Sequence, residues 1–269
     1  PLIRLHALTK SYAQTRSLPF VAAKRQTVLF PTTLDIRRGE ILGLIGESGS
    51  GKTTLGRAIM GLIDTDSGDI EFDGVSLTLA SQAIRQKMRR RAQIIFQDPY
   101  ASRNPKMTIG EQIAEPLRVY KLRPAGQIQA RVEELLKLVG LEAHHASRLP
   151  GAFSGGQRQR VAIARALALE PELLVADEAV SALDLSVRGQ ILALLDRLRE
   201  QLGLTVLFIS HDLAAVKQVC DRVVVLYHGK VVESGTTSEV LVAPQHPYTR
   251  QLLAAAPDIV QALQLRKAS

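Results

Sequence analysis

Short apolar runs alternate along this chain with segments in which apolar residues recur every three or four positions. The runs typical of strands are 2–7, 28–36, 40–45, 68–74, 91–96, 173–176, 205–209 and 222–227. The spacing of three and four residues predicts helices over 54–60, 158–168, 187–202 and 213–219. Strands that alternate with helices imply βαβ units, so we predict an α/β fold with a mainly parallel sheet.

Two segments depart from this rhythm. From 107 to 149 the pattern is helical throughout, with helices expected at 109–119 and 127–139 and a third short one after them. Segment 13–26 has no period and contains Pro19, so we expect a surface excursion there, and Pro31 weakens the strand 28–36. We therefore predict a helical insertion within an α/β domain.

Composition changes this picture little. Hydrophobic residues make up 46% of the chain and charged residues 22%, as in ordinary globular proteins. We expect no membrane span, because no apolar stretch is long enough, and no secretory signal, because residues 1–4 lead directly into a strand-like sequence. The formal charge of +8 favours a polyanionic partner, which nucleic acid, anionic lipid or nucleotide phosphates could each provide. The densest basic run, 85–91, is interpreted as a solvated helix face.

Cysteine content and the chain start add two expectations. The single cysteine, Cys220, excludes an internal disulfide and a zinc or iron–sulfur site built from cysteines. It lies in an apolar helical stretch, so we expect a packing residue in a reducing compartment. The chain starts at Pro1 rather than Met, which suggests a trimmed start or a piece of a longer chain.

One motif points directly to a ligand. Segment 46–54 follows a predicted buried strand, opens a predicted helix and fits the phosphate-loop pattern G-x-x-x-x-G-K-[ST]. Glycines let the loop turn its N–H groups inward, and the helix N-terminus adds partial positive charge. Lys52 is expected to reach the β- and γ-phosphates of a nucleoside triphosphate, and Thr53 to ligate Mg²⁺. The predicted binding residues are Gly46, Glu47, Ser48, Gly49, Ser50, Gly51, Lys52, Thr53 and Thr54.

An acidic pair, Asp177 and Glu178, follows the apolar run 173–176. Asp177 suits water-mediated coordination of Mg²⁺, and Glu178 can polarise an attacking water. Such a pair is also a common way to begin a loop. The phosphate loop in the same chain favours the catalytic interpretation.

A second anion-binding element precedes the helical run 158–168. It consists of Ser154, Gly155, Gly156 and Gln157, and combines a serine and two glycines with a helix N-terminus. We call each of the two anion-binding segments a phosphate cradle: 46–54 is the first and 154–157 the second. One nucleotide needs only one cradle. The economical explanation is that the second cradle serves a nucleotide held by another subunit.

Together these motifs resemble the ATP-binding subunit of ABC transporters over nearly the whole chain. Segment 154–157 matches the family signature, although Phe153 replaces the preferred leucine before it. Gln97 matches the Q-loop glutamine, and Asp184 closes a D-loop that spans 181–184. His211 matches the switch histidine, and Tyr12 stands where the family has an aromatic that stacks on adenine.

The resemblance implies roles for these residues. Two such domains would meet head to tail, with each ATP between the phosphate loop of one and the signature of the other. Glu178 would activate water and His211 would contact the γ-phosphate. Gln97 would contact Mg²⁺ and link the site to the helical insertion. Ala179 and Val180 replace the commoner Pro-Thr but preserve the acidic pair, so we expect activity to survive.

Some segments are similar to one branch of this family. Segments 98–110 and 246–253 resemble peptide and nickel importers, and 178–184 and 188–191 resemble the glutathione and oligopeptide importers. Arg103 departs from the usual leucine, and the C-terminal cysteine cluster of many members is absent from this sequence. The start at Pro1 leaves open the second half of a tandem ATPase.

The resemblance also implies an organisation. One ABC ATPase domain of the P-loop NTPase class would span 1–245. It would have a RecA-like core with an antiparallel N-terminal β subdomain in 1–106 and 150–245, and a helical subdomain in 107–149. Segment 246–269 would be an importer-type extension. The cofactors implied are ATP and Mg²⁺. The partners implied are a second ABC ATPase domain, two integral-membrane permease subunits and a periplasmic or surface solute-binding protein, without nucleic acid.

We predict that the chain hydrolyses ATP to power import of peptides or related small solutes, from a peripheral position at the cytoplasmic face of the membrane. Two alternatives stay open. One is a nickel or metal-chelate importer ATPase of the same branch, and the other is a non-transport ABC ATPase that acts on nucleic acid.

Overall fold

The computed structural model describes residues 1–13, 25–96 and 104–255. One antiparallel sheet contains β1 (Ile3–Ala13), β2 (Arg25–Ile36), β4 (Ser67–Phe72) and β5 (Val75–Ser76), in the order β2-β1-β4-β5. A second sheet contains β3 (Ile41–Ile45), β6 (Ala92–Ile95), β7 (Leu173–Asp177), β8 (Thr205–Ile209), β9 (Arg222–Tyr227) and β10 (Lys230–Thr236). Its order is β10-β9-β3-β8-β7-β6, and all neighbours are parallel except β10 and β9. The predicted mainly parallel sheet with a separate antiparallel part is confirmed.

Both faces of the second sheet are covered, and the strands show this in their side chains. In β7, Leu173 and Val175 join a hydrophobic cluster that includes the antiparallel sheet and helix α1 (Lys52–Ile59). Leu174 and Ala176 point to the other face and join a cluster with helices α5 (Gly155–Leu167), α6 (Leu185–Leu202) and α7 (Leu213–Val219). Strands buried on both faces appear in the sequence as unbroken apolar runs, which is how these strands could be predicted.

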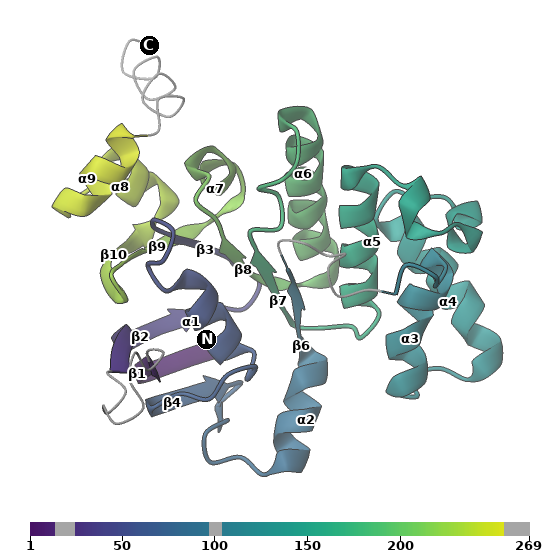
Figure 1. Ribbon diagram of the computed structural model, residues 1–269, viewed down its shortest axis with the longest axis horizontal. Helices are drawn as coiled ribbons and strands as arrows, with labels where there is room; N and C mark the ends of the chain where they lie inside the picture. The colour runs from purple at the N-terminus through teal and green to yellow at the C-terminus, as the bar shows by residue number, and fades with distance from the viewer. Residues whose placement is uncertain (14–24, 97–103, 256–269) are drawn as a thin grey trace, which may run out of the picture.

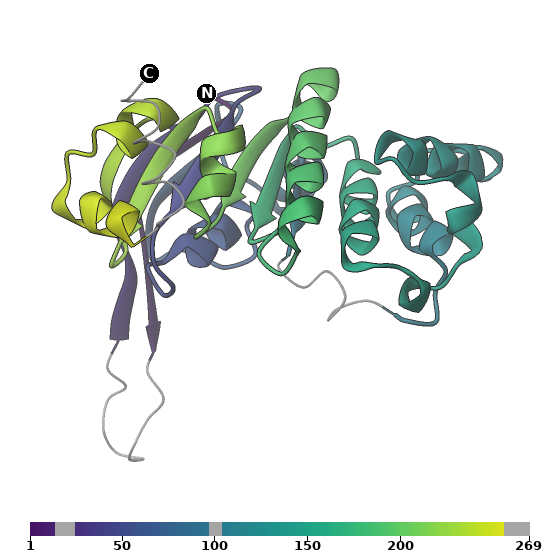
Figure 2. The same cartoon turned by 90° about the horizontal axis from the view of Figure 1, so that it is seen from above.

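The helical insertion forms a group of its own beside α5 (Figure 2). It contains α3 (Ile109–Val119), α4 (Ala125–Leu138) and the 3-10 turns η1 (Ala143–Ser147) and η2 (Pro150–Ala152). A capping box starts α3: Thr108 Oγ1 accepts from Glu111 N at 3.3 Å, and Glu111 Oε2 accepts from Thr108 N at 2.7 Å. Ile113 and Leu135 are buried in the same cluster as α5 and α6, so this part shares its core with the sheet.

The antiparallel sheet differs from the prediction in length. β1 continues past the predicted 2–7 to Ala13, which pairs with Arg25 of β2. Pro31 lies inside β2 at a register shift, between the pairs Lys10–Leu29 and Leu8–Thr32. The ladder is interrupted there, so a residue without an N–H is tolerated. The rest of the predicted excursion, 14–24, lies outside the described residues.

The last part of the chain contains elements that the pattern did not predict. β10 pairs antiparallel with β9, and it is followed by α8 (Thr237–Val242) and α9 (Pro247–Ala254). β10 has no buried residue, so it carries no clear apolar alternation that could have revealed it. Figure 1 shows α8 and α9 at the end of the molecule opposite the helical insertion.

Helix α2 (Gln82–Arg91) covers the whole basic run 85–91, which confirms the predicted helix, and most side chains of the run are exposed. Met88 is buried, and Arg91 is drawn into an ion-pair network. Arg91 Nη2 contacts Asp73 Oδ2 at 2.6 Å and Glu172 Oε2 at 2.8 Å. Arg38 pairs with the same two carboxylates. The network joins the loop before β3, the β4–β5 turn, α2 and the start of β7.

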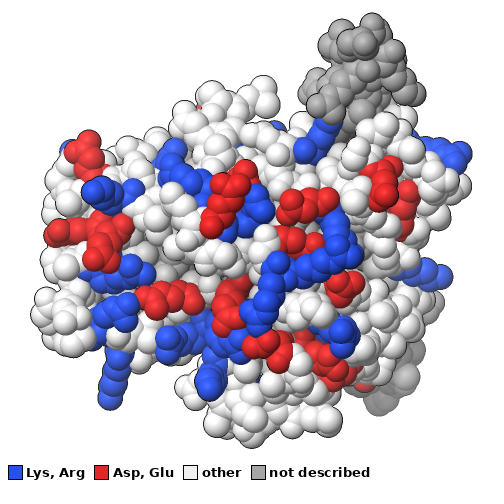
Figure 3. Space-filling view, turned by 180° about the vertical axis from the view of Figure 1, so that it is seen from behind, with Lys and Arg blue, Asp and Glu red and all other residues white. Residues whose placement is uncertain are grey.

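The remaining expectations concern surface and core. Basic and acidic side chains are interspersed over the face seen in Figure 3. Cys220 is buried and packs close to Gly43, which confirms a packing residue, and burial raises the pKa of its thiol. Among the residues described, no helix has the length and apolar character needed to cross a bilayer.

The shared carboxylate of the ion-pair network gives a stability prediction. Glu172→Gln should lower the free energy of unfolding by about 1 kcal/mol at pH 7, since the pairs are partly exposed. Hydrogen bonds from Arg91 and Arg38 hold the pKa of Glu172 below its usual value, against the effect of partial burial. Its contribution is therefore complete above the pKa of the unfolded carboxyl group and is lost as the pH falls through the folded value.

Urea unfolding at pH 7 and at about pH 3.5 measures this difference, which should shrink at the lower pH. Glu200→Gln is the control, because Glu200 is exposed and pairs only with Arg199 among the described residues. Equal stability of the Glu172 variant and the unsubstituted chain at pH 7 would contradict the prediction.

Candidate nucleotide-binding site

The carboxyl ends of the parallel strands meet at one edge of the second sheet. β3 ends at Ile45 and leads into segment 46–54, β7 ends at Asp177, and β8 ends at Ile209, two residues before His211. Open α/β sheets bind ligands outside these strand ends. Figure 1 shows β3, β8 and β7 side by side. Their parallel pairing brings the predicted phosphate loop, the acidic pair and His211 to the same edge, although they lie far apart in the sequence.

The phosphate loop needs glycine at its sharp turns. Gly46 has φ +148°, and a Cβ there would lie 2.2 Å from the carbonyl oxygen of Leu226. Inside the loop the buried Lys52 Nζ donates to the carbonyl oxygens of Gly46 and Glu47, each at 2.7 Å. Burial lowers the pKa of Lys52, against the attraction of the nearby carboxylates. The ammonium group thus lies enclosed by the loop, close to where phosphates are expected.

Two oxygen atoms from different elements meet beside the loop. Thr53 Oγ1 donates to Asp177 Oδ1 at 3.1 Å. Burial raises the pKa of Asp177, although the hydrogen bond from Thr53 opposes this shift. The described residues contain no cluster of three or more His, Cys, Asp or Glu that could hold a metal ion alone. This donor set fits Mg²⁺, which takes few protein oxygens and completes its shell with phosphates and water.

Glu178 has a constrained backbone next to this pair. Its φ of +50° is left-handed, and its N–H donates to the carbonyl oxygen of Ile209 at 3.0 Å. Ser181 Oγ donates to the carbonyl oxygen of Glu178 at 2.9 Å. The Glu178 carboxylate lies 3.3 Å from His211 Nδ1, which can donate to it. Such strain persists where surrounding contacts impose it, and it often accompanies functional groups.

Arg188 is a residue near the site that sequence reasoning did not single out. Its guanidinium pairs with Asp212, which directly follows His211. It also donates to the carbonyl oxygen of Leu183 at 3.1 Å, within the loop 181–184. Arg188 therefore connects the histidine end of β8 with the loop that follows Glu178. No sequence spacing could reveal this connection, because it depends on α6 packing beside α7.

The second cradle has the local structure that its sequence predicts. Ser154 Oγ accepts from Gln157 N at 3.3 Å, and Gln157 Oε1 accepts from Ser154 N at 3.0 Å, which forms a capping box for α5. A Cβ on Gly156 would lie 2.3 Å from Val187 Cγ1, so glycine permits the close approach of α5 and α6. This places 154–157 beside the loop that contains the exposed Asp184.

The two cradles do not meet within one chain. In both Figure 1 and Figure 2, α5 lies beyond α6 as seen from α1. Of the predicted site, the chain itself brings together Lys52, Thr53, Asp177, Glu178 and His211. Residues 154–157 and Asp184 stand apart from this group.

Two predicted contacts remain. Tyr12 pairs in register with Gln26, two residues before Val28, whose carbonyl oxygen lies against Gly51 of the phosphate loop. Tyr12 is 42% exposed, and the Lys10 ammonium group lies 5.2 Å from the centroid of its ring. Gln97 lies outside the described residues.

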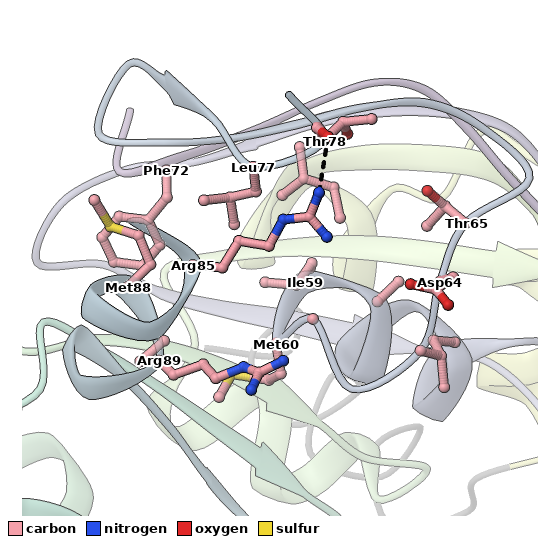
Figure 4. Close-up of a pocket in the computed structure, with 15 residues that line it drawn as sticks. Ile59, Met60, Asp64, Thr65, Phe72, Leu77, Thr78, Arg85, Met88 and Arg89 are labelled. Atoms are coloured by element: carbon pink, nitrogen blue, oxygen red, sulfur yellow. Dashed lines mark hydrogen bonds between the residues drawn. The ribbon is translucent and has the colours of Figure 1, made fainter. Parts of the chain in front are cut away.

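A cavity of about 240 Å³ lies elsewhere, between α1, β4 and α2 (Figure 4). Ile59, Phe72 and Met88 contribute apolar lining. Arg85 also lines the cavity, and its guanidinium group donates to the carbonyl oxygen of Thr78 at 3.0 Å. The cavity contains none of the predicted nucleotide-binding residues.

The fold and the loop geometry define a P-loop nucleotide-binding protein. Comparison with known families makes this specific: residues 29–181 match the ABC transporter family, and residues 232–269 match the C-terminal region of oligopeptide/dipeptide transporters. The chain belongs to the ABC transporter family and contains its ATP-binding cassette. The family resemblance seen in the sequence is confirmed.

Curated relatives are similar over almost the whole chain. The glutathione import ATP-binding protein GsiA of Shigella flexneri is 49% identical to this chain, and the match covers 96% of this chain. The same match covers only 41% of the length of GsiA. A Brucella ovis protein described as a peptide import ATP-binding protein is 48% identical over 96% of this chain and 79% of its own length.

Solved structures confirm the fold. The dimeric ATP-binding cassette MJ0796, bound to ADP and phosphate after hydrolysis, has a TM-score of 0.75 and 31% identity, covering 87% of this chain and 98% of that one. CbiO1 of Clostridium perfringens, part of the ABC transporter complex CbiONQ, has a TM-score of 0.79 and 28% identity, covering 98% of both chains.

The loop geometry predicts the effect of a single methyl group. Gly46→Ala should weaken binding of ATP at least about tenfold, because the Cβ meets a backbone oxygen and the loop must move. Titration with a fluorescent ATP analogue measures the affinity. Gly39→Ala is a matched control: Gly39 also has a positive φ, +71°, but an added Cβ meets no described atom within 4 Å.

Gly39→Ala should lose roughly 1–2 kcal/mol of stability in urea unfolding through left-handed strain. Gly46→Ala should lose at least as much, because the added Cβ also meets a backbone oxygen. Only Gly46→Ala should lose affinity. If the two variants bind the analogue equally well, the close approach at Gly46 has no part in shaping the site.

Proposed function

We propose that this chain binds and hydrolyses ATP with Mg²⁺ and supplies the energy for import of peptides through a membrane ABC transporter. The observation that carries the proposal is the meeting of Lys52, Thr53, Asp177, Glu178 and His211 at one sheet edge. This group contains a cation for phosphate, oxygen ligands for a hard metal ion, and a carboxylate beside a histidine. These are the parts that phosphoryl transfer to water requires.

Each residue contributes through its position. Lys52 would exchange the carbonyl oxygens of Gly46 and Glu47 for phosphate oxygens, a short movement for a flexible ammonium group. Thr53 and Asp177 would hold Mg²⁺, which neutralises charge on the β- and γ-phosphates. The Glu178 carboxylate would accept a proton from the attacking water. The neighbouring His211 would orient this carboxylate and contact the γ-phosphate. Gln97 and Tyr12 would add contacts to Mg²⁺ and to adenine.

The separation of the two cradles supports a dimeric active form. Ser154, Gly155, Gly156, Gln157 and Asp184 stand apart from the phosphate loop of their own chain. Ser154, Gly155 and Asp184 are exposed, so this segment and this loop are accessible and would complete the site of a second ATPase domain. That domain would be a second copy or a paralogue. MJ0796, at 31% identity, is dimeric in its solved form, which favours this arrangement.

The substrate class rests on the C-terminal match and on the names of the relatives. Residues 232–269 match oligopeptide/dipeptide transporters, and the relatives carry names for glutathione and peptide import. These names favour peptides over nickel chelates. Two permease subunits and a solute-binding protein would complete the system, with the ATPase attached peripherally at the cytoplasmic face of the membrane.

The role of Glu178 gives the first test. Glu178→Gln should keep ATP binding but lower turnover by about 10²- to 10⁴-fold, because an amide cannot accept the proton from water. A phosphate-release assay measures turnover, and size-exclusion chromatography with ATP should show a trapped dimer. Glu133→Gln, on an exposed face of α4, is the control and should hydrolyse normally. Near-normal hydrolysis by Glu178→Gln would remove the role assigned to it.

The same two proteins test transport when each is assembled with permeases and binding protein in vesicles. Labelled glutathione or dipeptide should accumulate in an ATP-dependent manner with the unsubstituted chain and not with Glu178→Gln. ATP hydrolysis without uptake of any peptide would contradict the assignment of peptide import, and uptake of a nickel chelate instead would replace the substrate class.

The composite site has its own test by mixing. Lys52→Ala should lose phosphate binding in its own loop, and Ser154→Arg should lose the signature contact to the partner's nucleotide. Each variant alone should therefore be inactive. A mixed dimer contains one site built from the intact loop of one chain and the intact serine of the other. Mixing should therefore restore phosphate release. If mixing restores nothing, or if Ser154→Arg alone remains active, the second cradle does not act on the partner's nucleotide.

A further inference from the structure

The C-terminal helix α9 reaches the phosphate loop through one side chain. Tyr248 Oη accepts a hydrogen bond from Glu47 N at 2.9 Å, across 201 residues of sequence. Glu47 is the second residue of the loop, directly after Gly46. We propose that Tyr248 is a positioning residue for nucleotide binding. It holds the first limb of the phosphate loop, Gly46 and Glu47, in the conformation that binds the nucleotide. This inference rests on the proposed function only in that the loop binds a nucleotide.

The tyrosine ring is held firmly. It is 5% exposed and stacks on Tyr227, with ring centroids 4.0 Å apart and an interplanar angle of 30°. Tyr227 ends β9, which pairs in parallel with β3, the strand that leads into the loop. The ring pair therefore stands on the same sheet edge as the loop. A hydroxyl group fixed in this way presents its oxygen at a constant position.

The start of α9 is also anchored to the sheet. Glu233 of β10 accepts backbone hydrogen bonds from Gln245 at 2.7 Å and from His246 at 3.0 Å. His246 Nδ1 in turn accepts from Tyr248 N at 3.2 Å and so caps the helix. Leu253 packs into the main hydrophobic cluster at the other end of α9. Tyr248 is thus supported from its backbone as well as from its ring.

The far limb of the loop has a separate support. The carbonyl oxygen of Ser50 accepts from Gly229 N at 2.9 Å, in the turn between β9 and β10. The first limb has Tyr248 and the hydrogen bonds from Lys52 Nζ to Gly46 and Glu47. When Lys52 turns to the phosphates it leaves these carbonyl oxygens. Tyr248 then remains as the side-chain contact that holds Glu47.

The consequence concerns affinity rather than chemistry. Without the Tyr248 hydroxyl group, the first limb gains freedom, and nucleotide binding must order it again. One neutral hydrogen bond corresponds to a loss of affinity of about three- to tenfold. Glu178 and His211, which follow β7 and β8, are not among the residues with which Tyr248 interacts. We therefore expect KM for ATP to rise with kcat almost unchanged, as for an interaction made equally in the ground state and the transition state.

Tyr248→Phe tests the inference in the full chain, because it removes the hydroxyl group and keeps the stacked ring. Tyr227→Phe is the matched control: it removes a hydroxyl group from the same ring pair, and within the described residues that group makes no hydrogen bond to the loop. Three quantities are measured: the affinity for a fluorescent ATP analogue, the midpoint of thermal unfolding, and amide hydrogen exchange in the peptide that contains Glu47 without nucleotide.

The expected result is a three- to tenfold weaker affinity and faster exchange at Glu47 in Tyr248→Phe, with an unfolding midpoint close to that of Tyr227→Phe. Equal affinity in Tyr248→Phe and the unsubstituted chain would overturn the inference, and so would unchanged exchange at Glu47. If the unsubstituted chain binds no ATP analogue, the proposed function fails instead, and the exchange measurement still decides whether Tyr248 holds the loop.

Discussion

Parallel pairing of β3, β8 and β7 is the constraint on which the candidate site depends. Each of these strands is buried on both faces, so its register is strongly specified by the hydrophobic cores on either side. Because the strands are parallel, their carboxyl ends meet, and Lys52, Asp177 and His211 come together although long segments separate them. The chemistry follows from this edge: a loop for phosphates, oxygens for a metal ion, and a carboxylate beside a histidine.

The same architecture keeps the two predicted anion-binding segments apart within one chain. The tight approach of α5 and α6 at Gly156 places the second cradle beside the loop 181–184 and not beside Lys52. In the proposed dimer, a partner would complete the site by placing its own residues 154–157 against the bound nucleotide. Arg188, which joins Asp212 to Leu183, connects the histidine end of β8 with the surface where the partner would lie. Binding and hydrolysis would thereby be coupled to association.

Most of the candidate site could be predicted from short motifs, because its chemistry is local. Segment 46–54 carries its glycines, lysine and threonine within one turn, and Asp177 and Glu178 follow one apolar strand. The residues that support the site could not be predicted. Tyr248 and Arg188 act through contacts across 201 residues of sequence and between neighbouring helices. Such contacts leave no periodic pattern and no local spacing in the chain.

The sequence alone determined the α/β order, the phosphate loop, the acidic strand end and the family to which they belong, since each depends on neighbouring residues or on a period of burial. It did not reveal β10, α8 and α9, whose apolar patterns are short and weak. Only the tertiary structure decided which groups meet. Packing brought the Tyr248 hydroxyl group to the backbone of Glu47 in the phosphate loop and kept Ser154 away from that loop. Which residues meet depends on the complete arrangement of strands and helices, and no local pattern in the sequence records it.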